Sequence, residues 1–263
     1  MEEDAPLVRQ LGPEVGAVYR DLHRERGVEF VTASVAAFEG QRAVRRVRTR
    51  DGRAIETDFV VAAVGAKPRA GLVRRAGVAV DGAIRTDEYL RTSVPNVFAA
   101  GDVANAYHPF YGRRLRVEHW DNARGQGATA ALNMLGRRVP YGRIPYFFCD
   151  QYEVGIEYRG GRDGHRPAGV PGDPDTRNFY AFWLDRGDRV VAGANVHTHE
   201  HGHGHDHDAH GRVHGHEDHE HVAAGDVGTV EALIRSRANV DVRKLTDVDE
   251  DLEGLTYVES EAS

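Results

Sequence analysis

Cysteine is nearly absent from this sequence of 263 residues, in which Cys149 is the only one. A single thiol excludes an intramolecular disulfide and any Cys-x-x-Cys redox pair. Nothing in the residues around Cys149 marks a reactive thiol, so we expect this side chain to serve as a small packing residue.

Long apolar runs and an excess of positive charge are also lacking. No run approaches the length of a membrane span, and the acidic residues 1–4 lack the basic-then-apolar pattern of a secretory signal. The net charge of −7 and the pI near 6.1 argue against nucleic acid or an anionic membrane as a partner. These observations predict a cytoplasmic protein that binds neither nucleic acid nor a membrane.

A third absence concerns dinucleotide binding. The sequence contains no Gly-x-Gly-x-x-Gly, the pattern that lets a pyrophosphate approach the amides of a helix N-terminus. Gly160, Gly161 and Gly164 have the wrong spacing and no helical pattern after them. The chain therefore lacks the usual cradle for the ADP half of a dinucleotide.

The most informative stretch that is present runs over residues 92–102. Residues 96–100 are short and apolar enough for a buried strand, Gly101 follows without a side chain, and Asp102 adds a carboxylate. Ligands of open α/β sheets lie beyond the carboxyl ends of strands, where a carboxylate can accept hydrogen bonds from sugar hydroxyls. The simpler alternative is a strand followed by a Gly-Asp turn.

Local patterns predict secondary structure on both sides of this stretch. Alternation and apolar runs indicate strands, and periodicity near 3.6 with terminal glycines indicates helices. The expected helices cover residues 11–27, 120–135 and 227–238. The expected strands cover residues 28–31, 59–64 (buried on both faces), 153–158, 178–184 and 189–196, with a hairpin around Asp51 and Gly52.

Three motifs occur in a familiar order: residues 92–102, residues 116–123 (Arg-Val-Glu-His-Trp-Asp-Asn-Ala) and residues 145–152 (Pro-Tyr-Phe-Phe-Cys-Asp-Gln-Tyr). Together they resemble FAD-dependent pyridine nucleotide-disulfide oxidoreductases, in particular the ferredoxin-reductase and apoptosis-inducing-factor branch. The resemblance implies an α/β fold of partial Rossmann-like FAD- and NAD(P)-binding domains, followed by an α+β C-terminal domain with an antiparallel sheet.

The same resemblance divides the chain into three regions. Residues 1–68 look like the C-terminal half of an NAD(P)-binding domain, and residues 69–143 look like the returning segment of an FAD-binding domain. Residues 144–263 look like the C-terminal interface domain, with a His-rich disordered insertion at 197–221. The chain thus resembles the C-terminal part of a longer enzyme.

The resemblance also implies a set of cofactor-binding residues. Asp102 would hold the ribityl or phosphate region of FAD, the start of the helix near residue 120 would lie beside the flavin, and Phe148 would cover its ring. On the residues alone, Glu118 is an ordinary helix-start carboxylate and Phe148 a core residue of a strand. The implied contacts are Gly101, Asp102, Glu118, His119, Trp120 and Phe148. No residue has the surroundings of a catalytic acid, base or nucleophile.

The function implied is electron transfer from NAD(P)H through FAD to a small iron–sulfur protein of the ferredoxin type. Two alternatives remain open: a non-catalytic metal-binding protein on the same scaffold, and a dimerising or regulatory fragment, with a homodimer as one form. Because the chain has no pyrophosphate cradle, we expect the 263 residues alone to bind FAD weakly or not at all.

A histidine tract is the last unusual feature. Eleven of the fifteen histidines lie between His197 and His221, interleaved with Gly, Asp and Glu. Imidazole is a good ligand for Ni²⁺ or Zn²⁺, and the lack of fixed spacing predicts a labile site in a disordered loop. A tolerated solvated insertion is the alternative. The candidate ligands are His199, His201, His203, His205, His207, His214 and His216.

Overall fold

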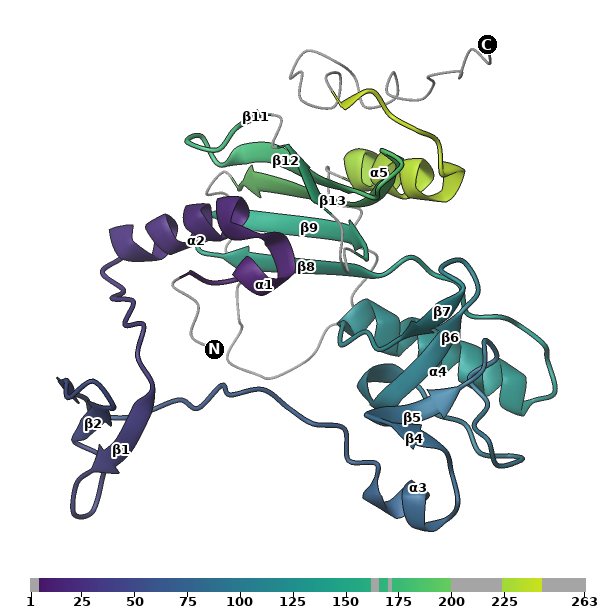
Figure 1. Ribbon diagram of the computed structural model, residues 1–263, viewed down its shortest axis with the longest axis horizontal. Helices are drawn as coiled ribbons and strands as arrows, with labels where there is room; N and C mark the ends of the chain where they lie inside the picture. The colour runs from purple at the N-terminus through teal and green to yellow at the C-terminus, as the bar shows by residue number, and fades with distance from the viewer. Residues whose placement is uncertain (1–4, 162–165, 170–171, 200–223, 243–263) are drawn as a thin grey trace, which may run out of the picture. The chain divides into compact units, whose positions relative to one another are not determined.

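The computed structural model divides the chain into two compact units, Met1–Lys67 and Pro68–Ser263. The three regions expected from the resemblance remain predictions. No helix among the described residues is long and apolar enough to cross a membrane. The structure describes residues 5–161, 166–169, 172–199 and 224–242 (Figure 1).

The first unit contains two consecutive helices and a small sheet. Pro13 occupies the first position of the second helix, where its missing N–H leaves no hydrogen bond unmade. Gly27 follows that helix in a left-handed conformation, with φ of 80°. The predicted helix over residues 11–27 is therefore confirmed. In chain order the elements are α1 (Val8–Leu11), α2 (Pro13–Glu25), β1 (Val35–Glu39), β2 (Arg46–Thr49) and β3 (Ala54–Glu56).

The sheet of the first unit is antiparallel, in the order β1-β2-β3. β2 and β3 form the predicted hairpin, with Gly52 at φ of 92° in its turn. Across the hairpin, Arg46 Nε donates to Glu56 Oε1 at 2.7 Å. The hairpin prediction is confirmed, and β1 adds a strand that the sequence patterns did not indicate.

Two predicted strands of this unit are wrong. Residues 28–31 and 59–64 have no strand structure and no ladder partner among the described residues. In the second run the exposed fractions are 75% for Phe59, 79% for Val61 and 93% for Val64. Apolar composition favours a strand only when a neighbouring strand supplies hydrogen bonds and covers the side chains.

The second unit contains two sheets and the remaining helices (Figure 1). Its elements in chain order are α3 (Gly71–Arg75), β4 (Val80–Asp81), β5 (Ala83–Thr86), the 3₁₀ turn η1 (Gly101–Val103), β6 (Ala104–His108), β7 (Arg113–Leu115), α4 (Trp120–Met134), β8 (Tyr146–Gln151), β9 (Val154–Gly160), β10 (Arg166–Gly169), β11 (Gly172–Asp173), β12 (Asn178–Leu184), β13 (Val190–Thr198) and α5 (Ala224–Ser236).

The four-stranded sheet has the order β4-β5-β6-β7, with β5 and β6 parallel and the outer pairs antiparallel. α4 packs on β6 through a cluster in which Ala130 and Ala106 lie with Leu90 and Tyr141. Gly136, at φ of 83°, follows α4. The predicted helix and the α/β character of this part are confirmed.

The predicted buried strand over residues 96–100 is wrong. Val97 N–H donates to Val94 O at 3.2 Å, and Asn96 has φ of 62°. Proline at the second position and a left-handed Asn at the third are the marks of a type II turn. Beyond this turn, Phe98 makes only an isolated bridge to Arg91. The strand of this region, β6, comes after Gly101 and not before it.

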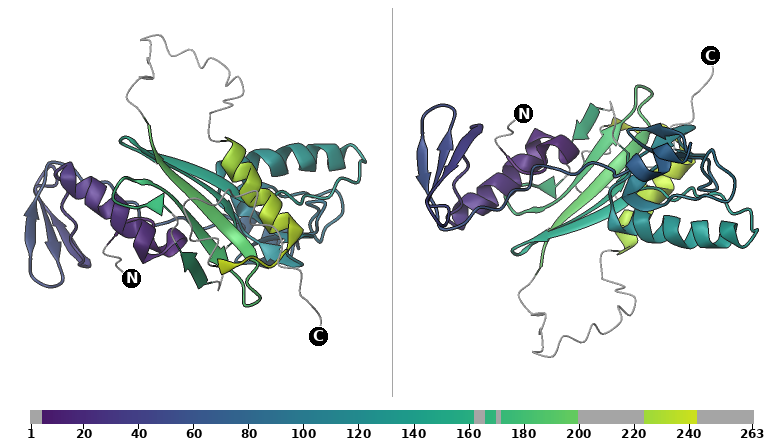
Figure 2. Two further views of the ribbon diagram at one scale, coloured as in Figure 1. Left: turned by 90° about the horizontal axis from the view of Figure 1, so that it is seen from above. Right: turned by 90° about the horizontal axis from the view of Figure 1, so that it is seen from below.

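The six-stranded sheet is antiparallel in the order β10-β12-β13-β9-β8, with β11 pairing to β12. Its strands β9, β12 and β13 correspond to the three alternating stretches seen in the sequence, so that prediction is confirmed. α5, the predicted helix over 227–238, contacts β13 and β9 and lies along one face of the sheet (Figure 2).

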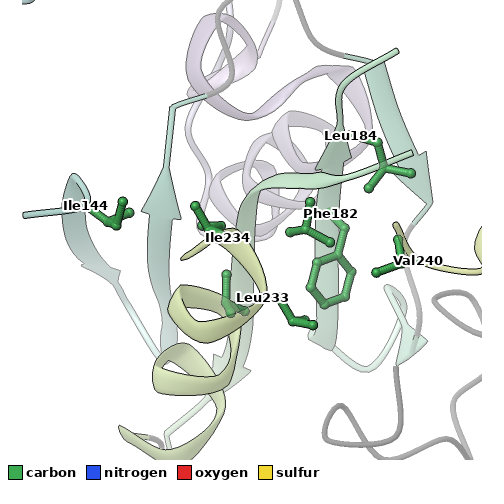
Figure 3. Packing of buried hydrophobic residues seen from close by; sticks show 8 residues of the cluster. Ile144, Phe182, Leu184, Leu233, Ile234 and Val240 are labelled. Atoms are coloured by element: carbon green, nitrogen blue, oxygen red, sulfur yellow. The ribbon is translucent and has the colours of Figure 1, made fainter. Parts of the chain in front are cut away.

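One core cluster of this unit lies between α5 and the six-stranded sheet (Figure 3). Leu233 and Ile234 of α5 pack with Phe182 and Leu184 of β12, all at most 2% exposed. Burying each such side chain contributes about 1.5–3 kcal/mol. Gly193 of β13 allows α5 to pack closely on the sheet, because a Cβ at that position would lie 2.7 Å from Val230 Cγ1 of α5.

Candidate functional site

Gly101 is held tightly between the four-stranded sheet and α4. It is buried with φ of 73°, and its N–H donates to Gln126 Oε1 at 2.8 Å. A Cβ on Gly101 would lie 3.3 Å from Ala123 Cβ. Glycine is therefore required by both the backbone and the approach of α4, and the next residue, Asp102, is exposed.

The N-terminus of α4 lies next to Gly101 and Asp102. We call these two residues and the start of α4 the flavin corner. His119 is the N-cap residue, and its side chain makes no capping hydrogen bond. The first backbone bond of the helix runs from Ala123 N–H to His119 O at 3.0 Å. The amides of the first turn have no side-chain cap and add the positive end of the helix dipole. In the same turn, the Asp121 carboxylate accepts from Arg143 Nη2 at 2.8 Å.

His119 is a partly buried imidazole. Its ring meets the Phe147 ring edge-on, with 5.1 Å between centroids. Its Nδ1 is buried and has no hydrogen-bond partner among the described residues. Burial lowers the pKa of His119, although the carboxylates of Asp102, Asp121 and Glu118 oppose that shift. The imidazole is therefore neutral near pH 7.

Glu118 and Trp120 flank this histidine and are largely exposed. Arg116 Nη1 donates to Glu118 Oε1 at 2.5 Å, so the carboxylate is held in a surface ion pair. The Trp120 side chain is 59% exposed, and the Arg124 guanidinium lies 4.5 Å from its ring centroid. The two side chains add one polar and one aromatic surface to the start of α4.

The two phenylalanines of β8 face opposite sides of the strand. Phe147 stacks on Tyr158 at 4.9 Å between ring centroids and also reaches His119. Phe148 is 55% exposed and lies beside Tyr146, at 6.3 Å. Because neighbouring side chains of a strand alternate, the register that brings Phe147 to the helix turns Phe148 away from it. A cofactor contact for Phe148 stays a prediction.

Hydrogen bonds of Asn122 stabilise the start of α4. The sequence patterns did not indicate this network. The buried Asn122 donates from Nδ2 to Val117 O at 3.0 Å and accepts from Tyr141 Oη at 3.1 Å. Burial raises the pKa of Tyr141 to about 12, so its hydroxyl stays protonated and remains a donor. The network holds the turn before α4, and with it His119.

Comparisons with known proteins show the family to which this chain belongs. Residues 2–127 match the family model described as pyridine nucleotide-disulphide oxidoreductase. The 5,5'-dehydrodivanillate O-demethylase ferredoxin reductase subunit of Sphingobium sp. (strain NBRC 103272 / SYK-6) is 38% identical over 72% of this chain and 47% of that protein. The chain belongs to the pyridine nucleotide-disulphide oxidoreductase family.

Further family members agree with this assignment. Putidaredoxin reductase CamA of Pseudomonas putida is 36% identical over 71% of this chain and 45% of its own length. The crystal structure of the covalent putidaredoxin reductase–putidaredoxin complex superposes with a TM-score of 0.79 at 30% identity, covering 95% of this chain and 55% of that one. The chain spans about half the length of the curated relatives it matches.

The residues of the corner fit one half of FAD. Asp102 offers an exposed acceptor, and the uncapped start of α4 offers positive potential. Trp120 offers an aromatic surface. The pyrophosphate half has no Gly-x-Gly-x-x-Gly partner in the sequence. These groups suit the flavin and ribityl portion, and contacts of Gly101, Asp102, Glu118, His119 and Trp120 with FAD stay predictions.

The predicted metal ligands fall mainly outside the described residues. Of the seven candidates, only His199 is described, and its Nε2 lies 3.3 Å from Asp150 Oδ1. Among the residues that the structure describes, no group of three or more His, Cys, Asp or Glu side chains is placed so that it could hold a metal ion. Ligands outside the described residues are His201, His203, His205, His207, His214 and His216.

Proposed function

We propose that this chain forms the flavin-facing and C-terminal part of an FAD-dependent NAD(P)H oxidoreductase of the ferredoxin-reductase type. The observation that carries the proposal is the corner of Gly101 and Asp102 against the uncapped start of α4, in a chain of this family. The relatives named as ferredoxin reductases support the reaction class.

Bound FAD supplies hydride acceptance from a nicotinamide and single-electron release to an acceptor. Asp102 would accept hydrogen bonds from the ribityl hydroxyls, and the first turn of α4 would stabilise negative charge on the cofactor. Trp120 would shield one edge of the cofactor from water. His119 is neutral, so the positive potential at this end of α4 comes from the helix amides. None of these residues acts as an acid, base or nucleophile.

The partner we propose is a small iron–sulfur protein of the ferredoxin type. Support comes from the covalent complex of a structurally similar reductase, putidaredoxin reductase, with putidaredoxin. A homodimer and a cytoplasmic location stay predictions. Ni²⁺ or Zn²⁺ binding by the tract from His199 to His216 also stays a prediction, as does a metal-binding role in place of electron transfer.

The test of the proposed flavin contact is FAD titration followed by flavin fluorescence. The 263-residue chain should bind FAD weakly and should not reduce ferricyanide with NADH or NADPH, because the ADP half has no cradle. Asp102→Ala should weaken the remaining affinity by roughly 10- to 100-fold, the scale of a charge-assisted hydrogen bond.

Asp81→Ala is the matched control, since Asp81 is an exposed carboxylate of the same sheet. It should leave FAD affinity unchanged. Equal affinity in the wild type and in Asp102→Ala would refute the assignment of Asp102. Robust turnover with about one flavin per chain would refute the claim that these residues hold only half of the cofactor.

A further inference from the structure

Three paired strands of the six-stranded sheet leave a notch on one face. Gly155 of β9 is in register with Asp150 of β8 on one side and with His197 of β13 on the other. Residues opposite one another on neighbouring strands share a face of the sheet. Asp150 and His197 therefore flank a position that has no side chain.

Three donor atoms converge on this notch. A Cβ placed on Gly155 would lie 2.5 Å from His199 Nε2, 2.9 Å from His197 Nε2 and 3.0 Å from Asp150 Oδ1. The two imidazole nitrogens and the carboxylate oxygen therefore all lie within 3.0 Å of one point. They come from two different strand ends, Asp150 from β8 and the two histidines from the end of β13.

The backbone holds both histidines in place. His199 N–H donates to Glu153 O at 2.8 Å, in the turn between β8 and β9. Between the histidines, Thr198 N–H donates to Asn178 Oδ1 at 3.1 Å, and Asn178 Nδ2 returns a bond to Thr198 Oγ1 at 3.1 Å. The His-x-His pair therefore keeps the two-residue period that places both rings on the same side.

The spacing of two of the donors is compatible with a shared metal ion. His199 Nε2 and Asp150 Oδ1 are 3.3 Å apart, which is a long hydrogen bond between the two side chains. Two ligands at about 2.0–2.1 Å from a tetrahedral zinc are roughly 3.3–3.4 Å apart. Both side chains are about half exposed, so an ion and its water ligands can enter.

Two buried atoms at or next to the notch also lack partners. His197 Nδ1 and Glu157 Oε2 make no hydrogen bond among the described residues. Glu157 lies two residues beyond Gly155 on β9 and faces the same side of the sheet. A metal-bound histidine commonly donates its second N–H to a carboxylate, which orients the ring.

We propose that His197, His199 and Asp150 bind one divalent cation of borderline softness, Zn²⁺ or Ni²⁺, with Glu157 positioning the ring of His197. Two imidazoles and a carboxylate are a usual ligand set for these ions. The three side chains close on the ion when it binds, because they do not already encircle it. This site is built into the sheet, from residues other than those assigned to the flavin.

The test must remove the background of the neighbouring histidines. In a full-chain variant, the nine other histidines of the tract are replaced by Asn, and Zn²⁺ and Ni²⁺ are titrated by calorimetry. This background variant should still bind one ion per chain. The replaced residues are His201, His203, His205, His207, His210, His214, His216, His219 and His221.

Two further substitutions on that background locate the site. Asp150→Asn removes a ligand and should weaken binding at least tenfold. Gly155→Ala keeps every donor but places a methyl group where they converge, and it should weaken binding to a similar extent. Gly161→Ala is the control, because a Cβ there meets only Tyr111 at 3.9 Å. Circular dichroism and thermal unfolding in chelator establish that each variant is folded.

Unchanged affinity in both Asp150→Asn and Gly155→Ala would overturn the proposal. So would the absence of binding by the background variant at millimolar Zn²⁺ and Ni²⁺. Loss of binding in folded Asp150→Asn and Gly155→Ala, with retention in Gly161→Ala, supports it.

Discussion

Residues 59–64 in the first unit and strand β13 in the second are both apolar runs, yet only one of them forms a strand. β13 is hydrogen-bonded on both sides, to β12 and β9, and Val196 and Ala192 within it are fully buried. Residues 59–64 have no ladder partner among the described residues, and Val64 is 93% exposed.

This difference shows what apolar sequence alone can decide. A strand supplies only half of its hydrogen bonds and half of its packing surface, and its neighbours supply the rest. β13 follows β12 directly in an antiparallel connection and pairs with the more distant β9 on its other side. The strands that would flank residues 59–64 are not among the described elements of the first unit.

Hydrogen exchange gives the largest expected contrast between the two runs. The amides of β9 and β13 should open only near global unfolding, whereas the amides of residues 59–64 should exchange almost as in an unfolded peptide. A difference of about a thousandfold or more follows from a domain of ordinary stability. Mass-spectrometric exchange on the purified chain measures it. Equal protection of both runs would mean that residues 59–64 form a strand in solution.

A Phe→Ala substitution should lower the free energy of unfolding strongly in the second unit and only slightly in the first. Phe182→Ala removes a ring that is 1% exposed and should lower the free energy of unfolding by about 3–5 kcal/mol. Phe59→Ala removes a ring that is 75% exposed and should cost less than about 0.5 kcal/mol. Urea denaturation of both variants checks this. A cost above about 2 kcal/mol for Phe59→Ala would show that the ring is buried.

Two glycine substitutions sharpen the comparison within the second unit. Gly101→Ala forces a left-handed alanine against Ala123 and should destabilise by roughly 1–2 kcal/mol. Gly127→Ala lies inside α4 with nothing within 4 Å of the new Cβ, and it should stabilise by about 0.5–1 kcal/mol. Thermal unfolding of the pair gives both signs. A neutral Gly101→Ala would contradict the close approach of α4.

The smallest expected effect is a pH dependence from buried imidazoles. Burial lowers the folded-state pKa of His119, so the unfolded chain binds its proton more readily. That part of the stability is complete above the ordinary pKa of 6.5 and is lost as the pH falls below it. His119→Gln should therefore flatten the decline in melting temperature between pH 7.5 and 5.5.

His108→Gln provides an independent check of this reasoning. Burial also lowers the pKa of His108, whose Nε2 lies 2.9 Å from Arg143 O. This variant should flatten the same decline. A pH dependence identical to that of the wild type in both variants would rule out buried neutral imidazoles as its cause.

Local pattern was sufficient for much of this protein. α2, α4, α5 and the strands β9, β12 and β13 follow from periodicity, terminal glycines and alternation, because each of these signals lies within a dozen residues. The hairpin at Gly52 follows from its turn residues. The importance of Gly101 was also visible, since a glycine before an exposed carboxylate is a local feature.

Only the tertiary structure decided the rest, because it depends on what each residue meets across the fold. The turn at Asn96 replaced a predicted strand even though Pro95 signalled it, and residues 59–64 found no partner strand. Strand register determined that Phe147 and not Phe148 reaches His119. Register also brought the carboxylate of Asp150 beside two histidines nearly fifty residues later, a juxtaposition that no spacing in the sequence encodes.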